Sequence, residues 1–212
     1  QHILANIFGY IEVEGNLNLS AGYKIVIDGF GEKEVIPIDI FDSEYFAKNY
    51  HYEGNDLGAT VSDGKTTFKV WAPTASKVVL NLFEAGHGVD AYKSVDMLLG
   101  EKGVWSYTED CGHGTYYTYT VTTAVGTQEA VDPYAKACGV NGDRGMVIDL
   151  DSTDPANWEN DQVVTLKKYS DATIWEIHVR DFSNTIASSQ YKGKYLAFTE
   201  HGLTNASGVS VG

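Results

Sequence analysis

The chain has 212 residues, of which 43% are hydrophobic, and a formal net charge of -14 from 15 basic and 29 acidic side chains. This length allows one large or two ordinary domains with a buried core, and the composition excludes a disordered or fibrous chain. No basic cluster offsets the acidic charge, which predicts no nucleic-acid partner, and no apolar run reaches the roughly 18 residues of a membrane span, which predicts no membrane partner.

The two cysteines, Cys111 and Cys138, lie in unlike contexts, without Cys-x-x-Cys spacing or a histidine at ligand spacing. Two separate thiols are expected, and a single disulfide is the less favoured alternative. The 14 Tyr and 4 Trp allow a carbohydrate ligand, because the C–H groups of a sugar pack on aromatic faces. Composition alone does not establish this ligand, because β-sandwich cores are also rich in Tyr and Trp.

Two or three short strands are predicted between Ile3 and about Phe41, as the tail of a larger domain or as a subdomain that packs on its neighbour. Ile7–Val13 and Gly22–Ile27 have the alternation of strands. Asp28–Gly29 is the favoured dipeptide of a two-residue hairpin loop, and Glu34–Ile40 is the expected returning strand. These strands are too few to form a complete β-sandwich.

A short helix is expected over Asp42–Asn49, with Asp42 or Ser43 as its N-terminal cap. The following segment, Tyr50–Thr60, is rich in Gly and Asn and is therefore expected to be a loop at a domain boundary.

The block that begins at Thr66 has the strand spacing of an immunoglobulin-like β-sandwich. The expected strands are Thr66–Ala72, Lys77–Phe83, Ser94–Leu99, Val104–Thr108, Thr115–Thr123, Gln128–Val131 and Met146–Ile148. Residues 151–172 are interpreted as a linker.

A further strand is predicted at Thr173–Arg180, and its two faces differ in chemistry. One face is almost wholly apolar, whereas the other carries Glu176, His178 and Arg180. The pattern fits either a half-buried surface strand or a strand in the wall of a (β/α)₈ barrel, and alternation alone does not separate the two.

Four motifs occur together in the chain: Gly-Asn-Asp-Leu-Gly at 54–58, Thr-Phe-Lys-Val-Trp-Ala-Pro-Thr-Ala-Ser at 67–76, Asp-Pro-Tyr-Ala-Lys-Ala at 132–137, and Trp-Glu-Ile-His-Val-Arg-Asp-Phe-Ser at 175–183. In this order and spacing the chain resembles type I pullulanases, which are α-1,6-glucan debranching enzymes of glycoside hydrolase family 13. Each motif is weak alone, and the four together are specific.

The resemblance implies a mainly β layout: an N-terminal β-rich subdomain at 1–50, a family 48 carbohydrate-binding module at 57–150, the linker at 151–172 and the first strand of the catalytic (β/α)₈ barrel within 173–212. It also implies hydrolysis of α-1,6 branches in pullulan, starch or glycogen by a retaining mechanism. Isoamylase, a glycogen-debranching relative and a non-catalytic starch-binding module are the alternatives.

In this family the catalytic residues follow later barrel strands, so the resemblance places none of them in this chain. The expected partners are an α-glucan substrate and the remainder of the catalytic domain, as a second chain or as further sequence. A lone barrel strand would leave its backbone groups without neighbours, so we expect residues 170–212 to depend on that remainder.

Several residues are candidates for a site, and a structural role is favoured for each. Glu176 and Asp181 are five positions apart, so on one strand they face opposite ways and do not flank one sugar. Trp71 and Trp105 are candidate sugar platforms, although core or interdomain packing is the favoured role.

Three tyrosines, Tyr116, Tyr117 and Tyr119, divide between two strand faces, so at least one points outward, and no substrate-binding residue is assigned. The acidic run Asp149–Asp154 lacks the glycine and terminal glutamate of a calcium loop, and His178 has no histidine partner, so no metal ligand is assigned. No cofactor is expected, and a structural calcium ion is an alternative without a supporting motif.

Overall fold

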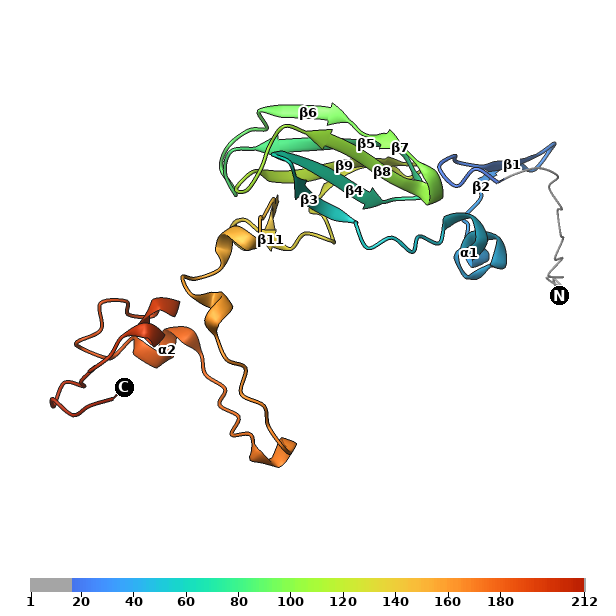
Figure 1. Cartoon of the computed structure of the whole chain (residues 1–212). Helices are drawn as coiled ribbons and strands as arrows, with labels where there is room; N and C mark the ends of the chain where they lie inside the picture. Colours follow the sequence, from blue (N-terminus) through green and yellow to red (C-terminus); the bar gives the residue numbers. More distant parts are fainter. Residues whose placement is uncertain (1–16, 212) are drawn as a thin grey trace, which may run out of the picture. The chain divides into compact units, whose positions relative to one another are not determined.

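The computed structural model describes residues 17–211, so the strand predicted at Ile7–Val13 lies outside the described residues. The chain divides after Pro155 into two compact units, unit 1 before this point and unit 2 from Ala156 onward (Figure 1). Within residues 17–211, no helix has both the length and the apolar character needed to cross a membrane.

The first described strands of unit 1, β1 (Lys24–Ile27) and β2 (Gly31–Glu34), form a two-stranded antiparallel hairpin. Ile27 pairs with Gly31, so the loop has three residues instead of the predicted two, and the returning strand starts before Glu34. The strand prediction at Glu34–Ile40 was therefore wrong beyond its first residue. Gly29 has a φ of 82°, a conformation that glycine adopts without steric cost.

Helix α1 (Glu44–Tyr50) follows a 3-10 helix, η1 (Asp39–Asp42). Ser43 is the N-terminal cap of α1, because its hydroxyl accepts a hydrogen bond of 3.1 Å from the backbone N–H of Phe46. This settles the choice between the two predicted capping residues.

A two-sheet β-sandwich forms most of unit 1 (Figure 1). One sheet has the order β3-β4-β8-β7 and the other has the order β11-β12-β9-β5-β6, with β10 also pairing with β9, and all pairs are antiparallel. The strands are β3 (Gly58–Ser62), β4 (Lys65–Trp71), β5 (Ala75–Phe83), β6 (Lys93–Asp96), β7 (Leu98–Leu99), β8 (Val104–Glu109), β9 (Tyr116–Thr123), β10 (Gly126–Ala130), β11 (Ala137–Cys138) and β12 (Gly145–Met146).

The core lies between the two sheets and is built by strand alternation. Phe68 of β4, Leu80 of β5 and Tyr117 of β9 are fully buried members of the core cluster, whereas the polar neighbours Lys69, Asn81 and Thr118 do not belong to it. The predicted strand Ser94–Leu99 is divided between the sheets, because β6 and β7 belong to different layers and Met97, between them, is buried. Both cysteines are free thiols.

Two loops of unit 1 touch through glycines. A Cβ atom on Gly86 would lie 2.9 Å from the Cα of Gly139, and a Cβ on Gly139 would lie 2.6 Å from the Cα of Gly86. Arg144 joins the same loops, because its guanidinium donates to the carbonyl oxygens of Ala85 and Val89, each at 2.7 Å. Neither glycine therefore has room for a side chain.

Unit 2 has short helices and extended segments. Over residues 156–211 the buried residues are Ser183, Ile186, Ser189, Ala197 and Leu203. The helices of unit 2 are α2 (Val179–Ser183), η5 (Trp158–Asn160), η6 (Tyr169–Asp171) and η7 (Tyr195–Thr199), while η2 (Glu101–Gly103), η3 (Val140–Gly142) and η4 (Asp151–Thr153) belong to unit 1.

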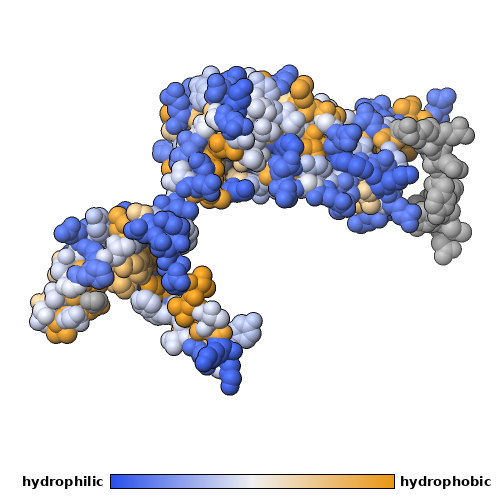
Figure 2. Space-filling view, in the orientation of Figure 1, coloured by the Kyte–Doolittle hydropathy of each residue, from blue (hydrophilic) through white to orange (hydrophobic). Residues whose placement is uncertain are grey.

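The strand predicted at Thr173–Arg180 is not formed in the structure, so this prediction was wrong. Residues 172–178 carry no strand assignment, and helix α2 begins at Val179. Among the described residues no strand pairs with this segment, and a strand is defined by its ladder of hydrogen bonds to a neighbour. Ile174 is 91% exposed, and Figure 2 shows hydrophobic surface in unit 2.

Candidate functional site

Unit 1 has a depression of about 400 Å³ between α1, the loop at residues 51–57, β4 and the loop at residues 131–136. We call it the aromatic depression, because most of its lining is aromatic: Phe41, Phe46, His51, Tyr52, Trp71 and Tyr134. Ala47 and Leu57 complete the lining.

Helix α1 and strand β4 bring the first wall together. Trp71 has the opposite strand parity to the core residues of β4, so its ring leaves the sandwich and meets α1. The ring centroids of Phe46 and Trp71 are 6.0 Å apart in an edge-to-face arrangement, and Phe46 stacks on Tyr50 at 5.3 Å. This wall therefore joins the N-terminal segment to the sandwich.

The polar edge of Trp71 is fixed by two carbonyl groups. Its Nε1–H donates to the carbonyl oxygen of Tyr50 at 2.9 Å and to that of Lys102 at 3.0 Å. Lys102 has a φ of 60°, an uncommon left-handed conformation for a residue other than glycine. The indole is thus held in one orientation, and its remaining exposed surface is apolar.

Tyr52 forms a second wall and is held by a carboxylate. Its hydroxyl donates to Asp56, which also accepts a hydrogen bond from the ammonium group of Lys69. The bond from Lys69, followed by that from Tyr52, lowers the pKa of Asp56, while the bond to Asp56 raises the pKa of Tyr52. Asp56 is therefore ionised at neutral pH and fixes the Tyr52 ring.

Tyr134 forms the third wall and is positioned by buried Asp132. The backbone N–H of Tyr134 donates to Asp132 at 2.8 Å, and the hydroxyls of Tyr117 and Tyr119 donate to the other oxygen at 2.8 and 3.4 Å. Burial raises the pKa of Asp132 despite these hydrogen bonds, and burial also raises the pKa values of both core tyrosines. Asp132 thus links the core to this wall.

Two glycines allow the walls to approach. A Cβ on Gly54 would lie 2.3 Å from the hydroxyl oxygen of Tyr52, and a Cβ on Gly58 would lie 2.9 Å from the carbonyl oxygen of Tyr134. Gly58 also has a φ of 98°, which favours glycine. A side chain at either position would displace a wall of the depression.

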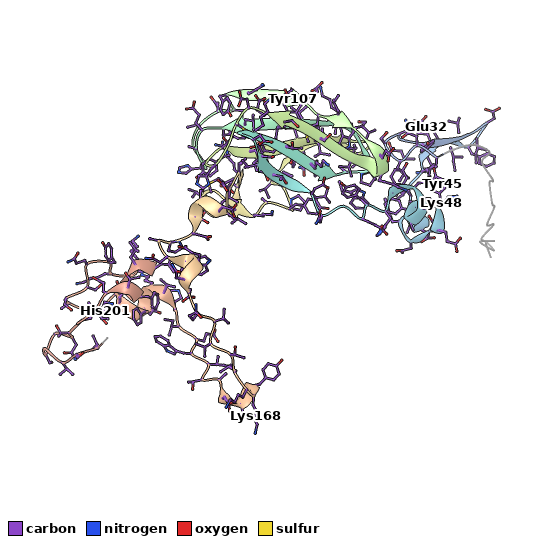
Figure 3. All side chains as sticks on the ribbon, viewed as in Figure 1. Glu32, Tyr45, Lys48, Tyr107, Lys168 and His201 are labelled. Carbon is purple, nitrogen blue, oxygen red and sulfur yellow. The ribbon has the colours of Figure 1, made fainter. Side chains whose placement is uncertain are left out.

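A second depression of about 380 Å³ adjoins the first, because Ala47 and His51 line both. We call it the polar depression, since its other lining residues are Lys48, Glu53 and Lys102. Lys48 lies on α1 (Figure 3), and its carbonyl oxygen accepts a hydrogen bond of 2.6 Å from the ammonium group of Lys102. His51 Nε2 lies 3.7 Å from Glu53.

Three of the four sequence motifs meet at the aromatic depression. The lining takes Leu57 from the 54–58 motif, Trp71 from the 67–76 motif and Tyr134 from the 132–137 motif. Asp56, also of the 54–58 motif, accepts the hydrogen bond from Tyr52. The depression has the concave, largely apolar lining of a ligand site and lacks a paired acid and nucleophile. A lining of this kind can accommodate the apolar surface of a ligand.

The residues singled out from the sequence are scattered in the structure. Trp71 lines the aromatic depression, whereas Trp105 lies in the core and donates to the carbonyl oxygen of Ala72 at 3.1 Å. Tyr117 and Tyr119 are core residues, and Tyr116 is only partly buried.

In unit 2, Glu176, His178, Arg180 and Asp181 are all exposed. His178 Nδ1 lies 3.4 Å from Asp181. Because α2 begins at Val179, the strand parity used for Glu176 and Asp181 does not extend to Asp181.

The acidic run Asp149–Asp154 forms a capped turn in which the hydroxyl of Ser152 donates to the carbonyl oxygen of Asp149 at 2.7 Å. Over residues 17–211, no group of three or more His, Cys, Asp or Glu side chains is arranged to hold a metal ion.

Sequence reasoning missed Phe46, His51, Tyr52 and Tyr134 as wall residues. A signal was present for two of them, since Tyr52 comes two residues before the 54–58 motif and Tyr134 lies inside the 132–137 motif. Phe46 and His51 join the site only through the contacts of α1 with β4.

Known proteins are similar both to the sandwich alone and to most of the chain. Residues 56–135 match the family described as carbohydrate-binding module 48 (isoamylase N-terminal domain). The chain is 37% identical over 183 residues to the pullulanase of Bacillus subtilis strain 168, covering 84% of this chain and 23% of that protein.

Solved pullulanase structures show the same fold. The pullulanase of Bacillus acidopullulyticus is 39% identical, with a TM-score of 0.75 over 92% of this chain and 24% of that one. The Paenibacillus barengoltzii pullulanase in complex with maltohexaose and α-cyclodextrin is 43% identical, with a TM-score of 0.70 over 80% of this chain and 26% of that one.

The chain therefore spans about a quarter of the length of these three pullulanases. The expected immunoglobulin-like sandwich is confirmed by its two sheets and by these structural relatives. Residues 56–135 are therefore similar to carbohydrate-binding module 48, and the chain as a whole is similar to part of the pullulanases named above.

Proposed function

We propose that this chain is part of a debranching enzyme that hydrolyses α-1,6-glucosidic bonds in pullulan, starch or glycogen, and that its sandwich binds the α-glucan. The observation that carries the proposal is the extent of the likeness: it covers 92% of the chain, well beyond the module at residues 56–135. Catalysis would use a retaining pair of carboxyl groups in sequence beyond these 212 residues.

The α-glucan ligand has its own support. A relative that is 43% identical has been crystallised with maltohexaose and α-cyclodextrin, both of which are α-linked glucose oligomers. The aromatic depression adds a surface of the chemistry that packs against sugar C–H groups.

The enzyme activity is tested by incubating the native protein with pullulan and identifying the products by chromatography. We expect maltotriose, because hydrolysis of the α-1,6 bonds divides pullulan into three-glucose units. Intact pullulan after exhaustive incubation, with debranching of amylopectin retained, would favour an isoamylase-like specificity instead. If both pullulan and amylopectin remain unchanged, the proposal of debranching activity is contradicted.

Binding is tested separately with the 212-residue chain in native gels that contain amylopectin or pullulan. We expect the polysaccharide to retard the chain and leave an unrelated protein such as albumin unaffected. Equal mobility with and without both polysaccharides would contradict the binding role.

A further inference from the structure

We infer that the aromatic and polar depressions together form one binding site for two or more consecutive glucosyl units of an α-glucan chain. The inference rests on the proposed function and deepens it, because it assigns the glucan to named residues in unit 1. The site belongs to the junction of α1 with the sandwich.

The aromatic depression matches the apolar part of a sugar. A glucosyl ring has C–H groups on its faces and hydroxyls around its edge, so it favours a cavity with aromatic walls and a polar rim. Trp71, Tyr52 and Tyr134 provide walls from three separate segments. Because the hydrogen-bonding edge of Trp71 already bonds two carbonyls, its partly exposed ring offers apolar contact.

Polar groups at the rim match the hydroxyls. Tyr134 is 37% exposed, and its hydroxyl has no hydrogen-bond partner within residues 17–211. His51 and Glu53 are exposed and lie next to each other, so the rim has a donor and an acceptor. A sugar hydroxyl both donates and accepts, and it can bond with each of these groups.

The charges of the polar depression favour a neutral ligand. Lys48 and Lys102 are cationic, but Glu53 lines the same depression, and Lys102 directs its ammonium group to the carbonyl oxygen of Lys48. A strongly anionic ligand would therefore be repelled by the carboxylate of Glu53, which lines the depression together with the two lysines. A neutral polyol meets no such repulsion and gains charge-assisted hydrogen bonds.

The dimensions favour an oligosaccharide over a single sugar. Each depression falls within the range of about 300–1,000 Å³ that is typical of small-ligand pockets. The two depressions measure about 400 and 380 Å³ and share Ala47 and His51, so a ligand that fills the first continues into the second. Affinity should therefore rise from maltose to maltohexaose.

The test is calorimetric titration of the 212-residue chain with maltose and maltohexaose, alongside single variants. Tyr134→Ala removes an exposed ring but keeps the backbone N–H that bonds Asp132, and His51→Ala removes the side chain shared by both depressions. Each variant should weaken maltohexaose binding about tenfold, which corresponds to the loss of roughly one aromatic or charge-assisted contact.

Tyr92→Ala is the matched control, because Tyr92 is an aromatic residue of unit 1, is 51% exposed and lies outside both depressions. It should bind maltohexaose as the parent does. Circular dichroism and thermal midpoints must be unchanged in the variants compared, and Tyr134→Phe, which keeps the ring, should retain most of the affinity.

The outcomes separate the site from the proposed function. If the parent binds maltohexaose and both Tyr134→Ala and His51→Ala bind it equally well, the glucan lies elsewhere and the assigned site is wrong. Equal loss in Tyr92→Ala would also overturn it, as would equal affinity for cellohexaose. If the parent binds neither maltohexaose nor amylopectin, both the site and the binding role of the sandwich fail.

Discussion

The β-sandwich of unit 1 and the segment at residues 172–178 of unit 2 start from the same pattern of alternating apolar and polar residues, and they differ in outcome. In the sandwich, Leu80 is fully buried between paired strands, whereas Ile174 in unit 2 is 91% exposed. Alternation specifies which residues share a face. A segment with this pattern forms a strand only where a neighbouring strand supplies the hydrogen bonds and a second layer covers its apolar side.

The comparison is tested first in the core, where we expect the largest effect. Leu80→Ala should lower the free energy of unfolding by about 2–5 kcal/mol, because it removes buried methyl groups and leaves a cavity. Denaturant unfolding of the chain, followed by tryptophan fluorescence, measures the change. A loss below about 1 kcal/mol would mean that the interior of the sandwich is loosely packed.

The next largest effect is expected at Asp132, which joins the core to the Tyr134 wall. Asp132→Ala should cost about 1–3 kcal/mol, because the hydroxyls of Tyr117 and Tyr119 lose a buried acceptor. Asp132→Asn keeps the size of the side chain and should cost less.

The pH dependence of the same position has a defined sign. Burial raises the pKa of Asp132 above its ordinary value of 3.8, so the folded state holds this proton more tightly than the unfolded state. The contribution of this group to folding stability is fully present below pH 3.8, the ordinary pKa of the carboxyl group. It is lost as the pH rises through the folded-state pKa. Asp132→Asn should therefore gain stability relative to the parent as the pH is raised through this window. A constant difference across the window would contradict the shift.

A smaller effect is expected at Asp56. Asp56→Ala removes the acceptor of Lys69 and Tyr52 at a partly exposed position, so the cost should be about 1 kcal/mol. The pKa of Asp56 is lowered, so its contribution is present above its ordinary value of 3.8 and is lost as the pH falls through the folded-state pKa. Urea unfolding of parent and variant at neutral and acidic pH should show the difference shrinking in acid.

The smallest effect is expected in unit 2. Ile174→Ala removes a similar amount of side chain to Leu80→Ala, yet it should change the free energy of unfolding by less than about 0.5 kcal/mol, because the residue is exposed. The same substitution in the native full-length protein, measured by thermal unfolding, would have a larger effect if another segment covers this face. A large loss in the 212-residue chain would show that residues 172–178 are already packed.

Much of the sandwich was predictable from sequence, because strands such as β4, β5 and β9 alternate strongly over seven to nine residues. Strand β3 was missed, because the glycine-rich segment before it indicated a loop. The division of the predicted strand Ser94–Leu99 at Met97 was also missed, because it depends on the pairing of β6 and β7 with different sheets. Pairing of this kind is a tertiary property that propensity does not contain.

The site was less accessible to sequence reasoning. Trp71 was named as a candidate, but its partner Phe46 is 25 positions earlier and Tyr134 is 63 positions later. No periodicity links such residues, and only the folded contacts between α1, β4 and the loop after β10 bring them to one depression.

The contact between Gly86 and Gly139 limits how this protein can be redesigned. Anyone who grafts a new peptide into one of these loops must rebuild the other at the same time, because each backbone occupies the space that a methyl group on the other would need. Library designs that randomise position 86 or 139 alone would place a side chain where the other loop leaves no room for it.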